Sequence, residues 1–230
     1  MALPKRIAIH EVGPREGMQI EKNPVATADK IRLVDMLSEC NFPEIEVTSF
    51  VSPKWVPQMA DAEEVVAGIK ARPGTAYTGI YLNSQGMVRA LKTNKLTVLG
   101  KLSITASETF SKKNTNRTLE ETLAEAEERI AAAREWNVKI TEIGVMSAFG
   151  CNYQGDIAPE LVISLIDRLI GTARENDLPI ELIQLADTMG WANPLSIRRL
   201  VGMVQDKWPE YKINLHLHDT RGLGLANVFA

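Results

Sequence analysis

The 230-residue sequence has few of the residues that mark specialised classes of protein. Its two cysteines, Cys40 and Cys151, are too few for a disulfide framework and too far apart for a zinc-type pair. Lys plus Arg (26) do not exceed Asp plus Glu (29), so the basic excess of a nucleic-acid-binding protein is missing. No apolar run reaches the ~18 residues of a membrane span. The start, MALPKRIAIHEVG, lacks the apolar stretch of a signal peptide. We expect a soluble, cytoplasmic protein that binds neither nucleic acid nor membrane.

The rest of the composition is that of an ordinary globular protein, with 45% hydrophobic and 24% charged residues. These fractions exclude a disordered or low-complexity chain. A chain of this length buries roughly 70% of its unfolded surface, so it needs neither disulfides nor a structural metal to fold. One α/β barrel or one to two smaller domains would fit the length.

Strand-like and helix-like segments alternate along the chain. Alternating apolar and β-branched residues predict seven strands, at Arg6–Val12, Pro43–Thr48, Thr75–Leu82, Lys95–Thr105, Lys139–Val145, Ile180–Leu185 and Lys212–His218. Helical periodicity predicts helices at Thr27–Cys40, Asp61–Ala71, Ser84–Leu91, Leu119–Trp136, Pro159–Asn176 and Pro194–Lys207. We expect Thr27 to cap the first helix, and Thr118 and Glu121 to form a capping box before Leu119.

The alternation predicts βαβ units and a parallel sheet. An open doubly wound sheet is one solution, but no G-x-G-x-x-G follows the first strand. Polar residues recur at several strand ends, as on the active-site face of a barrel. We therefore predict an α/β protein with a (β/α)8 TIM barrel fold, as a single domain over residues 1–230. The eighth βα unit is not apparent, and Gly222–Ala230 resembles a helix cut short, so we expect an incomplete C-terminus.

His216 and His218 form the sharpest local motif, because the chain has only three histidines. Residues i and i+2 of a strand project to the same face, so both imidazoles can reach one divalent cation. On spacing alone, two structural histidines with backbone partners remain an alternative.

A charged pair, Arg15 and Glu16, follows the first predicted strand within Glu11–Gln19. Gly and Pro on either side predict a sharp turn at the end of the strand. By itself this pattern is more typical of a turn with a surface salt bridge. A carboxylate together with two imidazoles would leave open positions on Mg²⁺ or Mn²⁺, and a guanidinium beside them could stabilise an oxyanion.

Five segments together resemble the 3-hydroxy-3-methylglutaryl-CoA lyases, a branch of the metal-dependent TIM-barrel superfamily of retro-Claisen lyases and Claisen synthases. The segments are Glu11–Lys22 (EVGPREGMQIEK), Ile45–Met59 (IEVTSFVSPKWVPQM), Ser107–Asn116 (SETFSKKNTN), Asp187–Gly190 (DTMG) and Leu215–Asn227 (LHLHDTRGLGLAN). The second of them is specific to the lyase branch.

The resemblance implies a carbon–carbon lyase that uses a divalent cation, Mg²⁺ or Mn²⁺. It implies cleavage of 3-hydroxy-3-methylglutaryl-CoA, or a close 3-hydroxy-acyl-CoA thioester, to acetyl-CoA and acetoacetate. A homodimer, and a place in leucine degradation and ketone-body metabolism, follow from the same likeness. The alternatives are a different acyl-CoA lyase or a Claisen-condensing synthase of the superfamily, and a catalytically inactive barrel fragment.

The resemblance also implies roles for individual residues. Arg15 matches the arginine that stabilises the enolate of acetyl-CoA, and Glu16, His216 and His218 match metal ligands. Glu46 and Asp187 match acidic active-site residues, so the implied catalytic residues are Arg15, Glu46, Asp187 and His216. The implied substrate-binding residues are Arg15, Gln19, Lys22, Ser49 and Asn114.

The sequence departs from the family pattern at two places. Glu16 stands where the lyases usually carry Asp. The homocitrate synthase branch of the superfamily also carries Glu at this position. The family's catalytic cysteine and an asparagine ligand come from a region beyond the seventh helix that has no counterpart here, and Cys151 matches a different family cysteine. Cys40 is expected to pack at the end of a helix. The run Lys112–Asn114 is by itself typical of a solvated loop, with contact to the phosphates of coenzyme A as the alternative.

Overall fold

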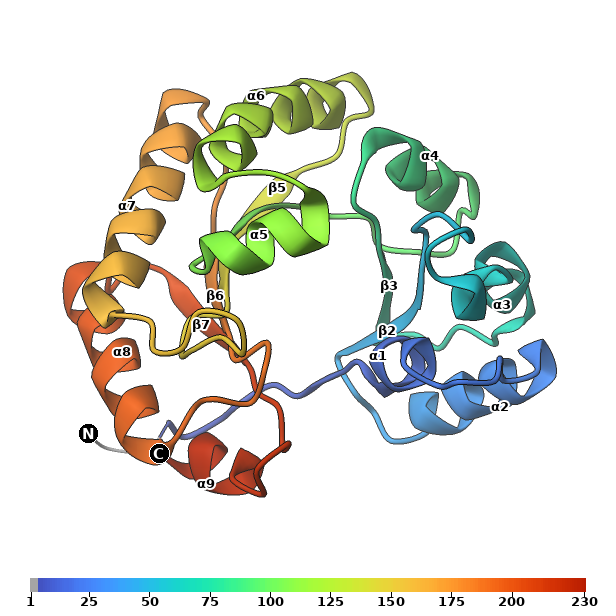
Figure 1. Ribbon diagram of the computed structural model, residues 1–230. Coiled ribbons are helices and arrows are strands. Elements are labelled where there is room, and N and C mark those ends of the chain that lie inside the picture. The colour runs from blue at the N-terminus through green and yellow to red at the C-terminus, as the bar shows by residue number, and fades with distance from the viewer. Residues whose placement is uncertain (1–3) are drawn as a thin grey trace. The chain divides into compact units, whose positions relative to one another are not determined.

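The computed structural model describes residues 4–230, which form two compact units. The first unit ends at Val98 and the second begins at Leu99. Each unit contains a parallel sheet with helices between its strands (Figure 1). None of the helices within residues 4–230 combines the length and the apolar character of a membrane-spanning segment.

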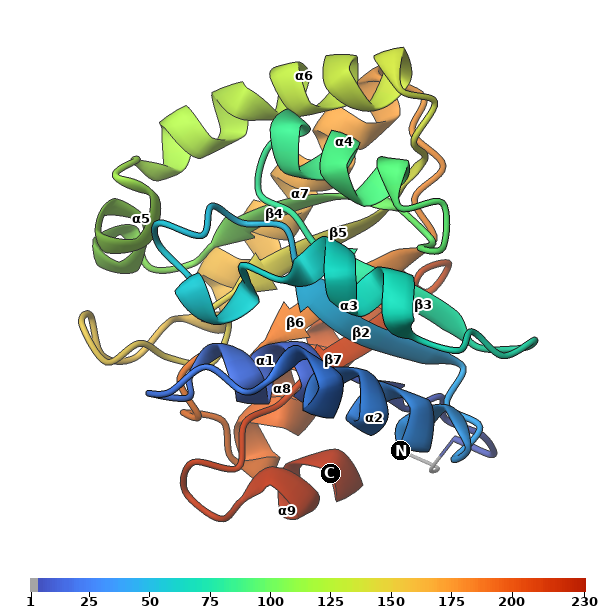
Figure 2. The same cartoon turned by 90° about the vertical axis from the view of Figure 1, so that its right-hand side faces the viewer.

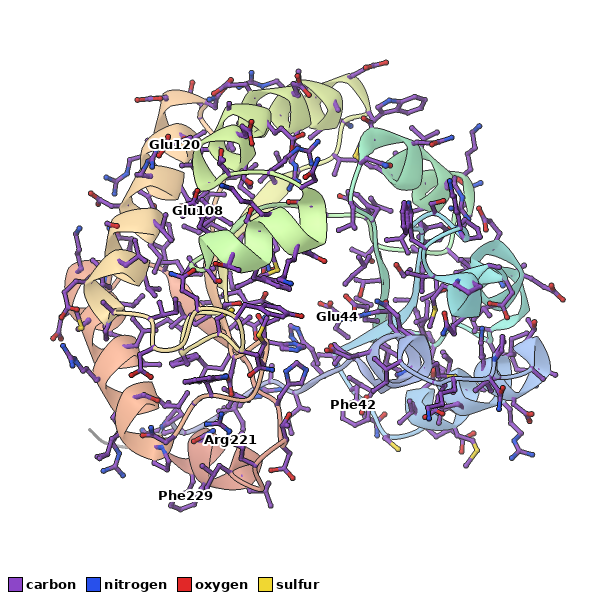
Figure 3. The ribbon with its side chains drawn as sticks, viewed as in Figure 1. Phe42, Glu44, Glu108, Glu120, Arg221 and Phe229 are labelled. Atoms are coloured by element: carbon purple, nitrogen blue, oxygen red, sulfur yellow. The ribbon has the colours of Figure 1, made fainter. Side chains whose placement is uncertain are left out.

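The first unit has a three-stranded sheet in the order β1-β2-β3. Its elements are β1 (His10–Glu11), α1 (Gly13–Gln19), α2 (Thr27–Ser38), β2 (Glu44–Ser49), the 3₁₀ helix η1 (Pro57–Met59), α3 (Ala62–Gly68), β3 (Ala76–Ile80) and α4 (Ser84–Lys92). Its core contains Val34 of α2, Ile45 and Val47 of β2, and Val65 of α3, and the half-buried Phe42 packs against this core (Figure 3). The helices thus bury one face of the short sheet.

The second unit has a four-stranded sheet in the order β4-β5-β6-β7. Its elements are β4 (Gly100–Thr105), α5 (Glu108–Thr115), α6 (Leu119–Glu135), β5 (Ile140–Met146), α7 (Pro159–Glu175), β6 (Leu182–Ala186), α8 (Pro194–Lys207), β7 (Lys212–His216) and α9 (Gly224–Phe229). Helix α6 packs on β4, and α7 packs on β4 and β5 (Figures 1 and 2). All four strands are parallel, so their carboxyl ends lie at one edge of this sheet.

Alternation along the strands of the second unit separates its two faces. Leu102, Ile143 and Ile183 are at most 1% exposed and belong to the core. The intervening residues are polar: Lys101 of β4 pairs with Glu142 of β5 at 2.6 Å and also contacts Gln184 of β6. Because side chains alternate between the faces of a strand, one face of this sheet is apolar and the other polar.

Most of the predicted elements are present with shifts of a few residues at their ends. All seven predicted strands occur within residues 4–230, and the capping box of Thr118 and Glu121 at the start of α6 is confirmed. The first strand is only His10–Glu11, shorter than the predicted Arg6–Val12. Thr27 does not cap α2: Ala26 occupies the N-cap, and the Thr27 hydroxyl instead donates to Asp61 at 2.8 Å.

Two predicted turns or loops are helices. Gly13–Gln19 forms α1, because Pro14 suits the first turn of a helix and the backbone N–H groups of Arg15 and Glu16 bond to the Val12 carbonyl. The run Lys112–Asn114 lies in α5, whose N-cap Ser107 accepts a hydrogen bond from the N–H of Phe110. Cys40 is exposed just after α2, so the expectation that it packs in the interior is wrong.

Candidate functional site

Polar residues of α1 and β2 in the first unit form a cluster around Arg15, here called the arginine cluster (Arg15, Glu16 and Glu46). Arg15 lies on α1, directly after β1, and Glu46 lies on β2. The Arg15 Nε donates to Glu46 Oε1 at 2.5 Å, and Nη2 donates to Glu16 Oε2 at 3.0 Å. The Arg15 side chain is only 12% exposed, so the guanidinium has a fixed position.

Glu46 has an altered acidity. Burial raises the pKa of the Glu46 carboxyl above its usual value of 4.5, and this effect outweighs the lowering by Arg15. The carboxylates of Glu16 and Glu44 raise the pKa further. The first unit therefore combines a positioned guanidinium with a carboxyl that holds its proton more tightly than in water.

The other predicted substrate-binding residues of the first unit, Ser49, Gln19 and Lys22, differ in how deeply they are buried. Ser49 is the last residue of β2 and is fully buried, and its Oγ has no hydrogen-bond partner within residues 4–230. Gln19 ends α1 and is half-buried, whereas Lys22 is exposed in the segment that follows. A buried hydroxyl without a partner at a strand end is a natural contact for a bound ligand.

In the second unit, the histidine cluster consists of Asp187, His216 and His218. His216 is the last residue of β7, and its ring centroid lies 5.0 Å from that of His218, with the ring planes at 89°. His218 Nδ1 is 2.9 Å from the backbone oxygen of Asp187, so Nδ1 carries the proton and donates it. The lone pair of the neutral ring is then on Nε2, as a metal-ligating imidazole requires.

Asp187 follows β6 and organises this cluster. It is fully buried, its N–H donates to the His216 carbonyl at 2.8 Å, and its Oδ1 accepts from the N–H of Trp191 at 2.7 Å. Its Oδ2 has no hydrogen-bond partner within residues 4–230. Both histidines are therefore hydrogen-bonded to the backbone of Asp187, and one buried oxygen of its carboxylate has no partner among the described residues.

Sequence reasoning missed Ser147, which directly follows β5. Ser147 is fully buried with a φ of 54°, its N–H donates to Thr188 Oγ1 at 2.8 Å, and its Oγ has no partner within the described residues. The rule that drew attention to Asp187, a polar residue directly after a strand, applied here too. Asn114 lies near the end of α5, the helix that follows β4, next to Lys112 and Lys113.

Comparison with known proteins identifies the family. A family model described as HMGL-like matches residues 6–230. A Pseudomonas aeruginosa protein named 3-hydroxy-3-isohexenylglutaryl-CoA/hydroxy-methylglutaryl-CoA lyase is 40% identical over 230 residues, covering all of this chain and 74% of the relative. The chain belongs to the HMGL-like family. The mitochondrial hydroxymethylglutaryl-CoA lyase of Bos taurus is 39% identical and is covered over 66% of its length, and the cytoplasmic human lyase is covered over 59%.

Solved structures of such lyases have the same fold. The crystal structure of hydroxymethylglutaryl-CoA lyase from Pseudomonas aeruginosa matches with a TM-score of 0.87 and 39% identity, over all of this chain and 73% of that one. A lyase from Acinetobacter baumannii, solved with coenzyme A and 3-methylmalate, matches with a TM-score of 0.82 and 36% identity, over 96% of this chain and 70% of that one. The TIM-barrel fold class, the family and the lyase class predicted from the sequence are confirmed.

Proposed function

We propose that this protein catalyses the retro-Claisen cleavage of 3-hydroxy-3-methylglutaryl-CoA, or a close 3-hydroxy-acyl-CoA, to acetyl-CoA and acetoacetate. The observation that carries the proposal is the fixed His216–His218 pair in a chain that matches these lyases from residue 6 to residue 230. The relatives' names and the coenzyme A in the Acinetobacter baumannii structure support the substrate class.

Two imidazoles and a carboxylate are the proposed ligands of a divalent cation. The geometry of the histidine cluster fits one, because the Asp187 carbonyl sets the tautomer of His218 and the two rings are neighbours, with centroids 5.0 Å apart. Glu16 in the first unit is the proposed third ligand. A mixed set of nitrogen and oxygen donors suits several divalent ions, of which we propose Mg²⁺ or Mn²⁺; when bound, the ion would polarise the oxygens of the substrate.

The reaction needs proton removal and charge stabilisation at separate atoms. Deprotonation of the tertiary hydroxyl at C3 breaks the C2–C3 bond, forms the ketone of acetoacetate and leaves the electron pair as the enolate of acetyl-CoA. We assign Arg15 to the thioester oxygen, where its guanidinium would stabilise the enolate charge. A proton delivered to C2 then completes acetyl-CoA.

Glu46, Asp187 and His216 are the proposed groups that hold or orient protons around these atoms. The raised pKa of Glu46 suits a carboxyl that holds a proton more readily than an exposed one, and we propose that its bond to Arg15 keeps it beside the enolate site. The Oδ2 atom of Asp187, which has no hydrogen-bond partner in the described part of the chain, is the proposed acceptor for the proton of the substrate hydroxyl. Gln19, Lys22, Ser49 and Asn114 are the proposed further contacts to the substrate.

The experiment is a cleavage assay with purified protein, 3-hydroxy-3-methylglutaryl-CoA and Mg²⁺ or Mn²⁺, read as acetyl-CoA release. We expect release that stops on chelation and is abolished by His216→Ala or His218→Ala. His10→Ala is the matched control, because His10 is the only other histidine in the sequence. Absence of release, or equal release by all three variants, would refute the proposal.

A second acyl substrate is favoured by one specific comparison. The Pseudomonas aeruginosa relative is named for a 3-isohexenyl as well as a 3-methyl substrate. Cleavage of a series of 3-hydroxy-acyl-CoA thioesters with lengthening branches at C3 would rank them. Condensation of acetyl-CoA with 2-oxo acids would instead support a synthase.

Three further properties are proposals of the same kind. We propose that residues 1–230 act as a single domain, that the protein assembles as a homodimer, and that it is cytoplasmic. Cytoplasmic relatives from Mus musculus and Homo sapiens support the location, although related lyases from other sources are mitochondrial. Sedimentation and cell fractionation would test the last two.

A further inference from the structure

Two loops of the second unit meet at the histidine cluster. One loop follows β6 and begins with Asp187, and the other follows β7 and contains His218. Their first contact is the hydrogen bond between His218 Nδ1 and the Asp187 carbonyl, at 2.9 Å. The same carbonyl accepts from the N–H of Gly190 at 3.1 Å, so a tight turn sets the direction in which the carbonyl points.

The two loops stay in contact beyond this bond. Gly190, with a φ of 68°, packs so closely on Thr220 that a Cβ atom added to the glycine would lie 2.7 Å from the Thr220 Cβ. One residue further along each loop, the Arg221 guanidinium lies over the Trp191 ring, with Cζ 4.8 Å from the ring centroid (Arg221 is labelled in Figure 3). Trp191 and Arg221 thus make the third in a series of contacts that advances along both loops.

Trp191 is also fixed by a third loop, the one that follows β5. Its indole Nε1–H donates to Asn152 Oδ1 at 2.7 Å. Gly150, with a φ of 148°, lies directly against the indole, because a Cβ atom there would be 2.6 Å from ring atom Cδ2. The backbone N–H of Trp191 donates to Asp187 Oδ1 at 2.7 Å. One residue therefore joins the loops after β5, β6 and β7, and it is bonded to the residue whose carbonyl receives the His218 proton.

The position of the proton on His218 depends on this arrangement. A neutral imidazole carries one proton, on either of its two nitrogens. The Asp187 carbonyl accepts a hydrogen bond and cannot donate one, so it selects the tautomer with the proton on Nδ1. If the loops moved apart, water would replace the carbonyl, and water both donates and accepts. Both tautomers would then be populated.

We propose that Trp191 is a positioning residue for His218: by joining the three loops, with Arg221 over its ring, it keeps the imidazole in the tautomer with the proton on Nδ1. The inference rests on the proposed function only for its consequence, which is that the ring presents Nε2 to the divalent cation. The tautomer itself belongs to the metal-free chain, and the loop contacts are its evidence.

The first measurement is nuclear magnetic resonance of the metal-free protein with ¹⁵N-labelled histidine, at about pH 8, where an ordinary imidazole is neutral. The nitrogen that carries the proton and the nitrogen that carries the lone pair have very different shifts, and His218→Gln assigns the signals. The parent His218 should have its proton on Nδ1. In Trp191→Leu the two nitrogens should move towards each other, as in a mixture of tautomers, whereas His10 should stay as in the parent.

Conservative variants separate this role from general packing. Trp191→Phe keeps an aromatic face for Arg221, although it lacks the N–H that bonds to Asn152, and Arg221→Lys keeps a cation over the ring. Both should retain the parent tautomer of His218 more fully than Trp191→Leu and Arg221→Ala do. Circular dichroism verifies that each variant folds. If Trp191→Leu does not fold, Arg221→Ala gives the same test, because Arg221 is exposed.

The matched control removes a different cation–π contact of the same unit. Lys207, the last residue of α8, lies over the ring of Trp208 at 4.5 Å. Lys207→Gln should leave the His218 signals unchanged, because this contact is at the opposite end of α8 from the loop that contains Trp191.

The second measurement is the affinity for Mn²⁺, followed by electron paramagnetic resonance. We expect Arg221→Ala to weaken binding about threefold, as for one exposed cation–π contact, and Trp191→Leu about tenfold. The double variant should lose no more than Trp191→Leu, because Arg221 has no ring to contact once Trp191 is replaced. Losses that add in the double variant would contradict the coupling of the two side chains.

Failure of this inference and failure of the proposed function give different results. The tautomer is read without metal or substrate, so a tautomer that depends on Trp191 upholds the positioning role even if no Mn²⁺ binds and no thioester is cleaved. The role is overturned if Trp191→Leu keeps the parent signals of His218, if Lys207→Gln changes them as much, or if the parent protein already shows mixed tautomers.

Discussion

Arg15 binds two carboxylates at once, and this sets what each residue of the arginine cluster can do. The bond to Glu46 crosses from α1 to β2, and the bond to Glu16 stays within α1. A guanidinium whose donors are engaged on two sides cannot rotate, so its remaining donors face one direction. Replacement by lysine would keep the charge but lose this fork geometry.

The pKa of Glu46 predicts a pH dependence of stability. Because the folded protein holds the Glu46 proton more tightly than the unfolded chain, this carboxyl favours the folded state most below pH 4.5 and loses that contribution as the pH rises through its raised pKa. The free energy of unfolding of the parent protein, minus that of Glu46→Gln, should fall from pH 4.5 upward. Urea unfolding at a series of pH values measures it, and a constant difference would contradict the assigned pKa direction.

The fixed tautomer of His218 predicts that metal binding depends on His216 and His218 and not on His10. His218→Ala or His216→Ala should weaken Mn²⁺ binding by more than about 100-fold, since changes to residues that merely orient ligands already cost 10–100-fold. Titration followed by electron paramagnetic resonance measures the free ion. His10→Ala should bind as the parent protein does, and comparable losses in all three variants would contradict the assignment of the pair.

At the scale of elements, helix α2 is attached to the start of α3 by a buried ion pair. Lys30 is 4% exposed, and its Nζ donates to Asp61 Oδ1 at 2.7 Å and to the Gln58 carbonyl at 2.5 Å. Thr27 donates to the other oxygen of the same carboxylate. These bonds join α2 to Gln58 and Asp61, which lie in the connection between β2 and α3, so they hold the end of this connection against α2.

Removing one partner of this ion pair should be costly. Lys30→Met should lower the free energy of unfolding by about 3 kcal/mol, because it leaves Asp61 largely buried without its cation. The double variant Lys30→Met/Asp61→Asn should recover part of the loss. Chemical denaturation of the two variants measures the difference; a loss below about 1 kcal/mol in the single variant would show that the pair is not a structural tie.

The capping box of α6 gives a second prediction for an element. The N–H of Glu121 donates to Thr118 Oγ1 at 3.1 Å, and Thr118→Ala removes this acceptor. We expect the substitution to lower the free energy of unfolding by about 1 kcal/mol. Thr118→Ser keeps an equivalent oxygen and is the control. If the serine variant loses as much as the alanine variant, packing of the Thr118 methyl group rather than the cap is responsible.

Across the whole chain, the proposed metal ligands come from two distant parts of the sequence. Glu16 belongs to the unit that ends at Val98, and the histidines belong to the unit that begins at Leu99. If they share one ion, Glu16→Gln should weaken Mn²⁺ binding by tenfold or more, although the histidine cluster itself is untouched. Glu11→Gln, an acidic residue of β1, is the control. Unchanged affinity in Glu16→Gln would remove Glu16 from the centre and leave the histidine pair.

Much of the fold could be predicted because its signals are local. Alternation of apolar residues along each strand, helical periodicity and the Thr118 cap depend on neighbours within a few positions, and they placed all seven strands within residues 4–230. The short helices α1 and α5 were missed because seven or eight residues carry too little periodicity to distinguish a helix from a turn. The proline in the first turn of α1 and the Ser107 cap of α5 stabilise these helices instead.

Local patterns of residues were enough to predict the alternation of strands and helices, the polar residues at strand ends and, through motifs, the family. The pairing of Arg15 with Glu46, the contact of the Asp187 carbonyl that sets the tautomer of His218, and the position of Lys113 over the Tyr153 ring became visible only in the folded chain. The first two contacts join residues 31 positions apart. The third joins helix α5 to the loop between β5 and α7. Such contacts depend on strand register and helix packing, which no local pattern of residues specifies.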